Sequence, residues 1–182
     1  FVLKNMAFIL PVKGVFPEFG KDNKLAPNAT ITGQVTTGVG CSFWFNCVVR
    51  GDVNTIRLGD YVNVQDGAII HGTYQKYATS IGNNVSIGHG AMVHGCTIHD
   101  NVLIGMGAIV MDGAEIGSNT IIAAGAIVLE NTKIEGGVVY GGVPARKLKD
   151  ISIDHIEGEI KRIAGNYNMY ASWYEDNFEN QG

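Results

Sequence analysis

The sequence has few residues of the kinds that cross-link or stiffen a chain. Its 182 residues include only three cysteines and four prolines. A low, odd cysteine count argues against a disulfide framework and favours a reducing compartment, so we expect a cytoplasmic protein. No secretory leader pattern stands at the start, and the sequence leaves open whether Phe1–Asn5, which precede Met6, are native.

Long apolar runs and a strong charge of either sign are also missing. The longest apolar candidate, Ile121–Leu129, contains Gly125 and falls short of the roughly 20 residues needed to cross a bilayer. The formal net charge is −4, which favours neither nucleic acid nor an anionic membrane surface as a partner. The length suffices for one domain with a sizeable core.

Glycine, in contrast, is abundant, with 25 residues spread among aliphatic side chains at a fixed period of six. A small or β-branched residue follows each large aliphatic residue by four positions. In the second half of the chain the aliphatic positions are Ile98, Ile104, Val110, Ile116, Ile122, Val128 and Ile134. A β-sandwich does not keep a fixed six-residue phase, so the pattern predicts short strands wound into a repetitive coil.

The same register extends upstream, which makes most of the chain repetitive. Its earlier positions are Leu25, Ile31, Thr37, Phe43, Val49, Leu58, Val64, Ile70, Ile81, Ile87 and Val93. This pattern resembles the left-handed parallel β-helix of hexapeptide repeats, in which three hexapeptides form one triangular coil and Gly or Asn occupies the turns. We therefore expect a mainly β fold. The eleven-residue step from Ile70 to Ile81 predicts a bulge of five extra residues.

The repeat ends after Tyr140, and the residues from Ser152 onward have helical spacing. Their apolar stripe consists of Ile156, Ile160, Ile163, Tyr167, Tyr170, Ala171 and Tyr174. Ser152 or Asp154 could cap this helix. We expect a β-helix domain over residues 8–148, followed over residues 149–182 by a helix that packs on the flank of the prism.

Winding the chain places two histidines together. His71 and His94 each follow the aliphatic residue of the same prism face in successive coils, and Arg50 holds this position one coil earlier. The three side chains should form one outward-facing stack, with the two histidines close enough to share a metal. His89 falls on an adjacent face or corner and points away from the pair.

A threefold axis would bring His89 of one chain against the pair of its neighbour, so the spacing predicts a homotrimer with metal sites between subunits. Three neutral imidazoles with an open fourth position are typical of catalytic zinc, which activates a bound water as a hydroxide nucleophile near neutral pH. His99 and His155 have no comparable partners and should be surface residues. The three cysteines should be small core residues.

Three segments carry a more specific likeness: RGDVN (residues 50–54), NVQDGAIIH (63–71) and IGHGAMVHGC (87–96). With them, the chain resembles the γ-class carbonic anhydrases and their bacterial relatives from about Leu25 to Arg146. The resemblance implies His71, His89 and His94 as ligands of Zn²⁺, with Fe²⁺ or Co²⁺ as alternatives, and CO2 and bicarbonate as substrates.

The resemblance also implies roles for five further residues. Arg50, Asp52 and Asp66 correspond to interfacial charged residues, for which a structural network and bicarbonate binding are both open. Gln65 corresponds to the residue that hydrogen-bonds the metal-bound hydroxide. Tyr140 resembles a tyrosine near the metal.

The likeness fails where the archetypal enzymes place the acidic residues that carry protons to buffer. Val53 stands at one such place, and the loop after His71, GTYQKYATS, has no carboxylate. We therefore expect CO2 hydration that is slow or limited by small buffers. Two other functions stay open: an acyl-CoA-dependent acyltransferase on the same fold, which would need one histidine base and a CoA groove, and a non-enzymatic metal-binding trimer.

Overall fold

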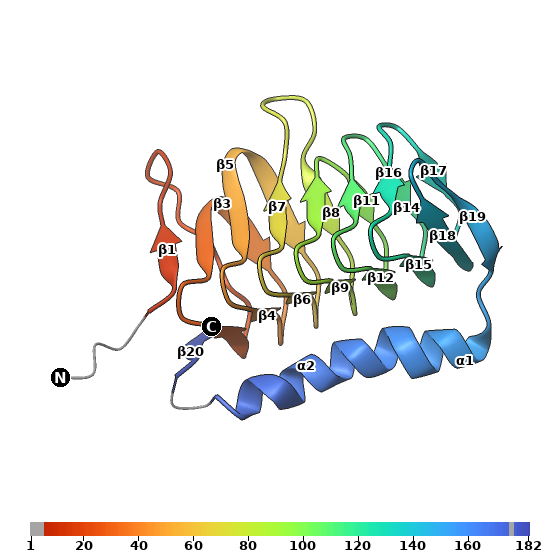
Figure 1. The fold of residues 1–182 in the computed structure, drawn as a ribbon. Helices are drawn as coiled ribbons and strands as arrows, with labels where there is room; N and C mark the ends of the chain where they lie inside the picture. The colour runs from red at the N-terminus through yellow and green to blue at the C-terminus, as the bar shows by residue number, and fades with distance from the viewer. Residues whose placement is uncertain (1–5, 175–176) are drawn as a thin grey trace.

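The computed structural model describes residues 6–174 and 177–182, so Phe1–Asn5 lie outside the described residues. The chain forms a parallel β-solenoid with one long helical segment lying along its side (Figure 1). The predicted mainly β architecture, a parallel β-helix of hexapeptide repeats followed by a C-terminal helix, is confirmed.

The strands form two hydrogen-bonded sheets that run along the solenoid. The first contains β1 (Phe8–Leu10), β3 (Thr30–Thr37), β5 (Val48–Leu58), β7 (Ile69–His71), β8 (Thr79–Ile81), β10 (Met92–His94), β11 (Thr97–Ile98), β13 (Ile109–Val110), β14 (Glu115–Ile116), β16 (Ile127–Val128) and β17 (Lys133–Ile134). The second contains β2 (Asn23–Leu25), β4 (Ser42–Phe43), β6 (Asn63–Val64), β9 (Ser86–Ile87), β12 (Val102–Ile104), β15 (Thr120–Ile122), β18 (Val138–Gly142), β19 (Ala145–Asp150) and β20 (Glu179–Gln181).

These two sheets make three prism faces, because the first sheet bends at the long strand β5 and so forms two of the three faces. The first residues of β5 pair with β7 and its last residues pair with β8. The face that begins with β7 continues through β10, β13 and β16, and the face that begins with β8 continues through β11, β14 and β17. The second sheet, from β2 to β18, is the third face.

The register of the coils agrees with the six-residue pattern. Ile98 pairs with Ile81, and Ile104 pairs with Ile87, as the repeat predicts. The only step of five residues, from Val93 to Ile98, does not shift this register. Gly95 absorbs the shorter step with a φ of 55°, and its N–H donates to the carbonyl of His71 on the neighbouring coil at 3.0 Å.

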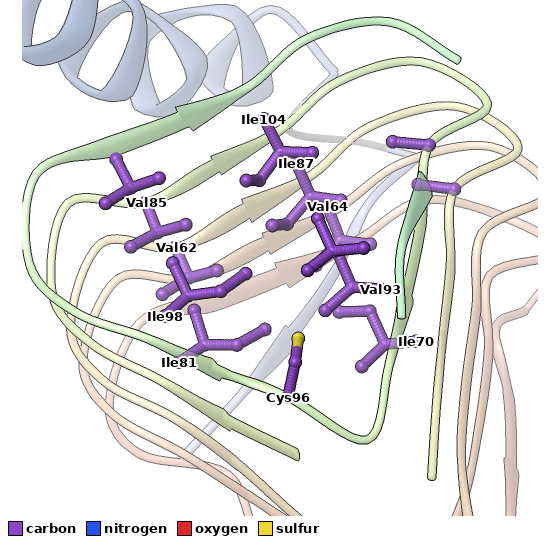
Figure 2. Close-up of a cluster of buried hydrophobic side chains, with 14 of the residues drawn as sticks. Val62, Val64, Ile70, Ile81, Val85, Ile87, Val93, Cys96, Ile98 and Ile104 are labelled. Carbon is purple, nitrogen blue, oxygen red and sulfur yellow. The ribbon is translucent and has the colours of Figure 1, made fainter. Parts of the chain in front are cut away.

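The aliphatic residues of the repeat point inward from all three faces and fill the prism (Figure 2). Ile70, Ile87, Ile104 and Ile122 have no exposed surface. Turns between the faces use left-handed backbone at Gly and Asn, such as Gly90 at a φ of 64°. This is the conformation that these residue types tolerate best.

The helical segment consists of α1 (Ile153–His155), the π-helix η1 (Ile156–Lys161) and α2 (Arg162–Ser172). Ser152 is the N-cap, and its hydroxyl accepts from the N–H of His155 at 3.3 Å. In Figure 1 the helix runs from the β18–β19 end of the solenoid back toward β4 and β20. Buried Ile160 and Ala171 belong to the predicted apolar stripe, and Tyr167 packs edge-on against Trp44 of the solenoid. Within the described residues, no helix combines the length and apolar character that a membrane crossing requires.

Candidate metal centre

The predicted histidine pair lies on one face of the prism, on adjacent strands. His71 ends β7 and His94 ends β10, and the two residues are register partners. Their side chains point outward because the residues before them, Ile70 and Val93, fill the core. The Nδ1 atom of His71 lies 3.1 Å from the Nε2 atom of His94.

A carboxylate holds the other nitrogen of each ring. His71 Nε2 lies 3.0 Å from Asp52 Oδ1, and His94 Nδ1 lies 2.5 Å from Asp112 Oδ1. An ionised carboxylate only accepts hydrogen bonds, so the protons of the neutral rings belong on these outer nitrogens. The two inner nitrogens then carry lone pairs that face each other, which is an unfavourable contact unless a cation or a proton lies between them.

This donor set fits a metal ion. Two imidazole nitrogens that each lie about 2.0–2.1 Å from tetrahedral zinc are roughly 3.3 Å apart, close to the separation found here. Carboxylates behind ligand histidines are typical of zinc sites. Within the described part of a single chain, no group of three or more His, Cys, Asp or Glu residues is gathered for a metal. A third protein ligand from another copy of the chain stays a prediction.

The charge states suit metal binding. Burial lowers the pKa of His71, against the opposing hydrogen bond to Asp52, so the ring is neutral at pH 7. Burial would raise the pKa values of Asp52 and Asp112, but hydrogen bonds outweigh it and lower both. Asp52 is bonded to His71 and Arg50, and Asp112 is bonded to Thr73 and His94. Both carboxylates are therefore ionised, and the neutral ring of His71 is ready to bind a metal.

Arg50 joins this cluster from β5. Its Nη1 atom lies 2.5 Å from Asp52 Oδ2, and its Nη2 atom lies 3.4 Å from His71 Nδ1. The predicted stack of Arg50, His71 and His94 is thus present in one chain, and Asp52 accepts from the guanidinium.

His89 lies on the turn between β9 and β10, away from the pair, as the winding predicts. The left-handed backbone of Gly90 turns the chain between the two faces, so five residues separate histidines that point in different directions. His89 also has a carboxylate: its Nδ1 lies 2.9 Å from Asp66 Oδ2. Its Nε2 lies 3.3 Å from the hydroxyl of Tyr167 in α2.

Gln65 lies near His89 and not near the pair of His71 and His94. Its side chain is buried, and its Nε2 donates to Asn63 Oδ1 at 2.9 Å. Asn63 in turn donates to Ser86 Oγ at 2.7 Å, which fixes the amide network. Gln65 and His89 line one end of an apolar cavity of about 400 Å³ between the solenoid and α2.

Tyr140 lies on β18, three strands along the sheet from β9, so one chain does not bring it to either group of histidines. The sequence analysis missed Asp112 and Tyr167. Asp112 is the second residue after Val110, which pairs with Val93. The repeat therefore places Asp112 one coil beyond His94, and its position near that histidine could have been predicted. The sequence places Tyr167 on the apolar stripe of the helix. Nothing in the six-residue repeat predicts that its hydroxyl contacts His89.

Two other expectations concern residues outside the cluster. All three cysteines are buried and unpaired, and burial raises the pKa of Cys96 to about 12, so it is a core residue rather than a thiolate ligand. His99 is half exposed and lies 3.1 Å from Glu115, a surface contact on another face.

The chain is similar to known hexapeptide-repeat proteins in sequence and in structure. A family model described as "Bacterial transferase hexapeptide (six repeats)" matches residues 78–110 and 95–130. A crystal structure from Bacillus cereus, the BC4754 gene product described as a proposed acetyltransferase, superposes with a TM-score of 0.89. It is 36% identical in sequence, and the match covers 93% of this chain and 98% of that one.

Curated relatives point to a narrower family. A protein of Methanocaldococcus jannaschii described as a probable carbonic anhydrase is 48% identical over 85% of this chain and 94% of its own length. Gamma carbonic anhydrase 2 of Arabidopsis thaliana mitochondria is 40% identical over 90% of this chain, which spans only 62% of that protein. Taken with the hexapeptide solenoid, these similarities show that the chain belongs to the γ-carbonic anhydrase-like family.

Proposed function

We propose that the chain forms a homotrimer that binds one metal ion at each subunit boundary and interconverts CO2 and bicarbonate. The observation that carries this proposal is the arrangement of three carboxylate-backed histidines in two places. His71 and His94 form a pair, and His89 stands alone on another corner. Threefold symmetry can join each pair to a single histidine and so complete three ligands at every boundary.

In this proposal, His71 and His94 of one chain and His89 of the partner subunit hold zinc, with Fe²⁺ or Co²⁺ as alternatives. The bound metal supplies an activated water near neutral pH. The carboxylates of Asp52 and Asp66 fix the orientations of the rings of His71 and His89. Their negative charge also makes the imidazoles better donors.

Gln65 has the placement of a residue that orients the attacking water. It lines the same cavity end as His89, so a symmetry operation that carries His89 to a neighbouring pair carries Gln65 with it. Its amide is held by Asn63, which reduces the conformational entropy lost when it binds the reacting group.

Arg50 offers a planar, forked donor beside the pair, suited to bicarbonate or to a carboxylate. Asp52 already occupies one of its nitrogens, while Asp66 lies with His89. In a trimer, Arg50 can therefore bind Asp66 of the partner subunit, bind bicarbonate, or do both. Tyr140 has no comparable contact, and its assignment rests on family likeness alone.

Proton removal is the weak step of this proposal. The two carboxylates nearest the pair, Asp52 and Asp112, are hydrogen-bonded to imidazoles, and the loop over residues 72–78 contains no acid. Catalysis that must release a proton in each cycle should then depend on diffusible buffer.

The test combines metal content, oligomeric state and stopped-flow CO2 hydration, with zinc and, without oxygen, with ferrous iron. We expect a trimer with one metal per chain and a rate that rises with buffer concentration. His94→Ala and His89→Ala should each lose metal and activity, while His99→Ala is the matched surface control. A fully metallated trimer that is inactive at every buffer concentration would rule out CO2 hydration.

The same measurements address acyl transfer, which the description of the Bacillus cereus structure brings forward. A transferase with a histidine base needs no metal. A metal-free protein that binds CoA and transfers an acyl group from it would therefore favour acyl transfer over the function proposed here. A metallated trimer without either activity would favour a metal-binding role alone.

A further inference from the structure

The insertion between β7 and β8, residues 72–78, is tied at both ends to the strands that carry the histidine pair. Thr79, the first residue after it, is buried. Its hydroxyl donates to the carbonyl of His71 at 2.5 Å and accepts from the N–H of Gly95 at 3.0 Å. One hydroxyl thus joins the backbone at His71 to the backbone just after His94.

At the other end, Thr73 reaches His94 through a carboxylate. Thr73 Oγ1 donates to Asp112 Oδ2 at 2.6 Å, and Asp112 Oδ1 accepts from His94 Nδ1 at 2.5 Å. The two oxygens of Asp112 therefore have different partners, one on the insertion and one on the imidazole. A carboxylate held at both oxygens cannot rotate away from the ring.

We propose that Asp112 is a positioning residue for the metal centre, which sets the proton position and orientation of the His94 ring, and that Thr73 of the insertion holds Asp112 for this task. The inference rests on the proposed metal site. It extends that site by a residue from the next coil and gives the insertion a specific role.

The physical reason lies in the two nitrogens of His94. With Asp112 accepting at Nδ1, the Nε2 atom that faces His71 keeps its lone pair for a metal. Without the carboxylate, the proton can move to Nε2 and the ring can turn, and each change removes a ligand from the pair. The insertion then matters because it supplies the hydroxyl that stops Asp112 from turning.

A second His–carboxylate pair in the same solenoid provides a matched comparison. His99 and Glu115 lie 3.1 Å apart on adjacent strands of another face, and both side chains are nearly half exposed. The structure shows no threonine hydroxyl on Glu115 and no second histidine facing His99 among the described residues. Glu115→Gln therefore makes a similar chemical change without touching the proposed site.

The experiment measures Co²⁺ binding to metal-stripped protein by its visible absorption, together with thermal unfolding of the metal-free form. We expect Asp112→Asn to weaken Co²⁺ binding about 10–100-fold and to alter the absorption band, with a near-normal unfolding midpoint. Thr73→Val should weaken binding less, Thr73→Ser should restore it, and Glu115→Gln should leave it unchanged.

The outcomes separate this inference from the proposed function. Wild-type-like binding and absorption in both Asp112→Asn and Thr73→Val would overturn the inference while leaving the metal site intact. A wild-type protein that binds no Co²⁺ would overturn the metal site and the inference together. If Asp112→Asn does not fold, the comparison of Thr73→Val with Thr73→Ser decides, and equal binding by those two variants would overturn the role of the insertion.

Discussion

The coils before and after Ile98 differ in regularity and in chemistry. From Ile98 to Ile134 every step between core aliphatic residues is six residues long. Between Val49 and Ile98 three steps depart from six: nine residues from Val49 to Leu58, eleven from Ile70 to Ile81, and five from Val93 to Ile98. The predicted metal-ligand histidines all lie in this irregular half.

Each irregular step lies next to a candidate residue. The nine-residue step contains Arg50 and Asp52, the eleven-residue step begins just before His71, and the five-residue step begins just before His94. The nine-residue step supplies Asp52 and the eleven-residue step supplies Thr73, whereas Asp66 and Asp112 come from six-residue steps. The regular coils therefore supply rigidity and some of the carboxylates beside the histidines, and the departures from the repeat add further partners.

The largest expected effect should come from breaking the regular half. Ile122 has no exposed surface, so Ile122→Ala should lower the free energy of unfolding by about 2–5 kcal/mol through lost burial and a cavity. Urea denaturation measures this loss. Leu129→Ala, at a position that is 45% exposed, should cost far less. Equal losses for the two variants would contradict the idea of a tightly packed regular half.

A smaller effect should come from the irregular half. Thr79→Val keeps the shape of the side chain but removes the hydroxyl that bridges the carbonyl of His71 and the N–H of Gly95, which then keep only their bond to each other. We expect a loss of about 1 kcal/mol in the free energy of unfolding, accompanied by weaker Co²⁺ binding. Thr79→Ser retains the hydroxyl and should preserve both. Normal metal binding by Thr79→Val would show that this clamp does not set the spacing of the pair.

The turns of the regular half provide a third test. Asn101 has a φ of 56°, so Asn101→Ala should cost about 1 kcal/mol because its Cβ crowds the left-handed backbone. Asn101→Gly should be better tolerated at the same φ. The two variants are compared by thermal unfolding at one protein concentration. Greater loss with Gly than with Ala would indicate that the side chain of Asn101, rather than its backbone conformation, is what matters.

The smallest signal is expected from the thiols, which test how tightly the coils before Ile98 are closed. Burial raises the pKa values of Cys41, Cys47 and Cys96 to about 12. At pH 8 the thiols are therefore almost entirely protonated, and native protein should react slowly with an alkylating reagent. All three should react once urea unfolds the chain. Rapid native labelling of Cys96 would show that the five-residue step opens readily.

The fold could be predicted from the sequence because each core position repeats and each repeat fixes a face. The same register placed His71 beside His94 and turned His89 away, without any knowledge of side-chain contacts. Asp112 was within reach of that reasoning, since it stands one coil beyond His94. It was missed because the second position after the aliphatic residue was followed on the face of Ile87 and not on the face of Val93.

Contacts of the helix could not be found in this way. The apolar stripe predicts that the segment packs on the prism, but the period of the solenoid does not fix how far along the axis each helical residue lies. The contact between Tyr167 and His89 depends on that position and on the π-helix η1, which changes the phase of the residues after it. The oligomer likewise depends on surfaces that no repeat specifies.

The antiparallel strands at the two ends of one sheet have a consequence for aggregation. β19 covers the open edge of β18, and β20 covers the open edge of β2. A parallel solenoid with bare ends could add further coils from another molecule by backbone hydrogen bonding. Strands running in the opposite direction interrupt that parallel stacking, so this face of the prism resists growth into end-to-end fibres.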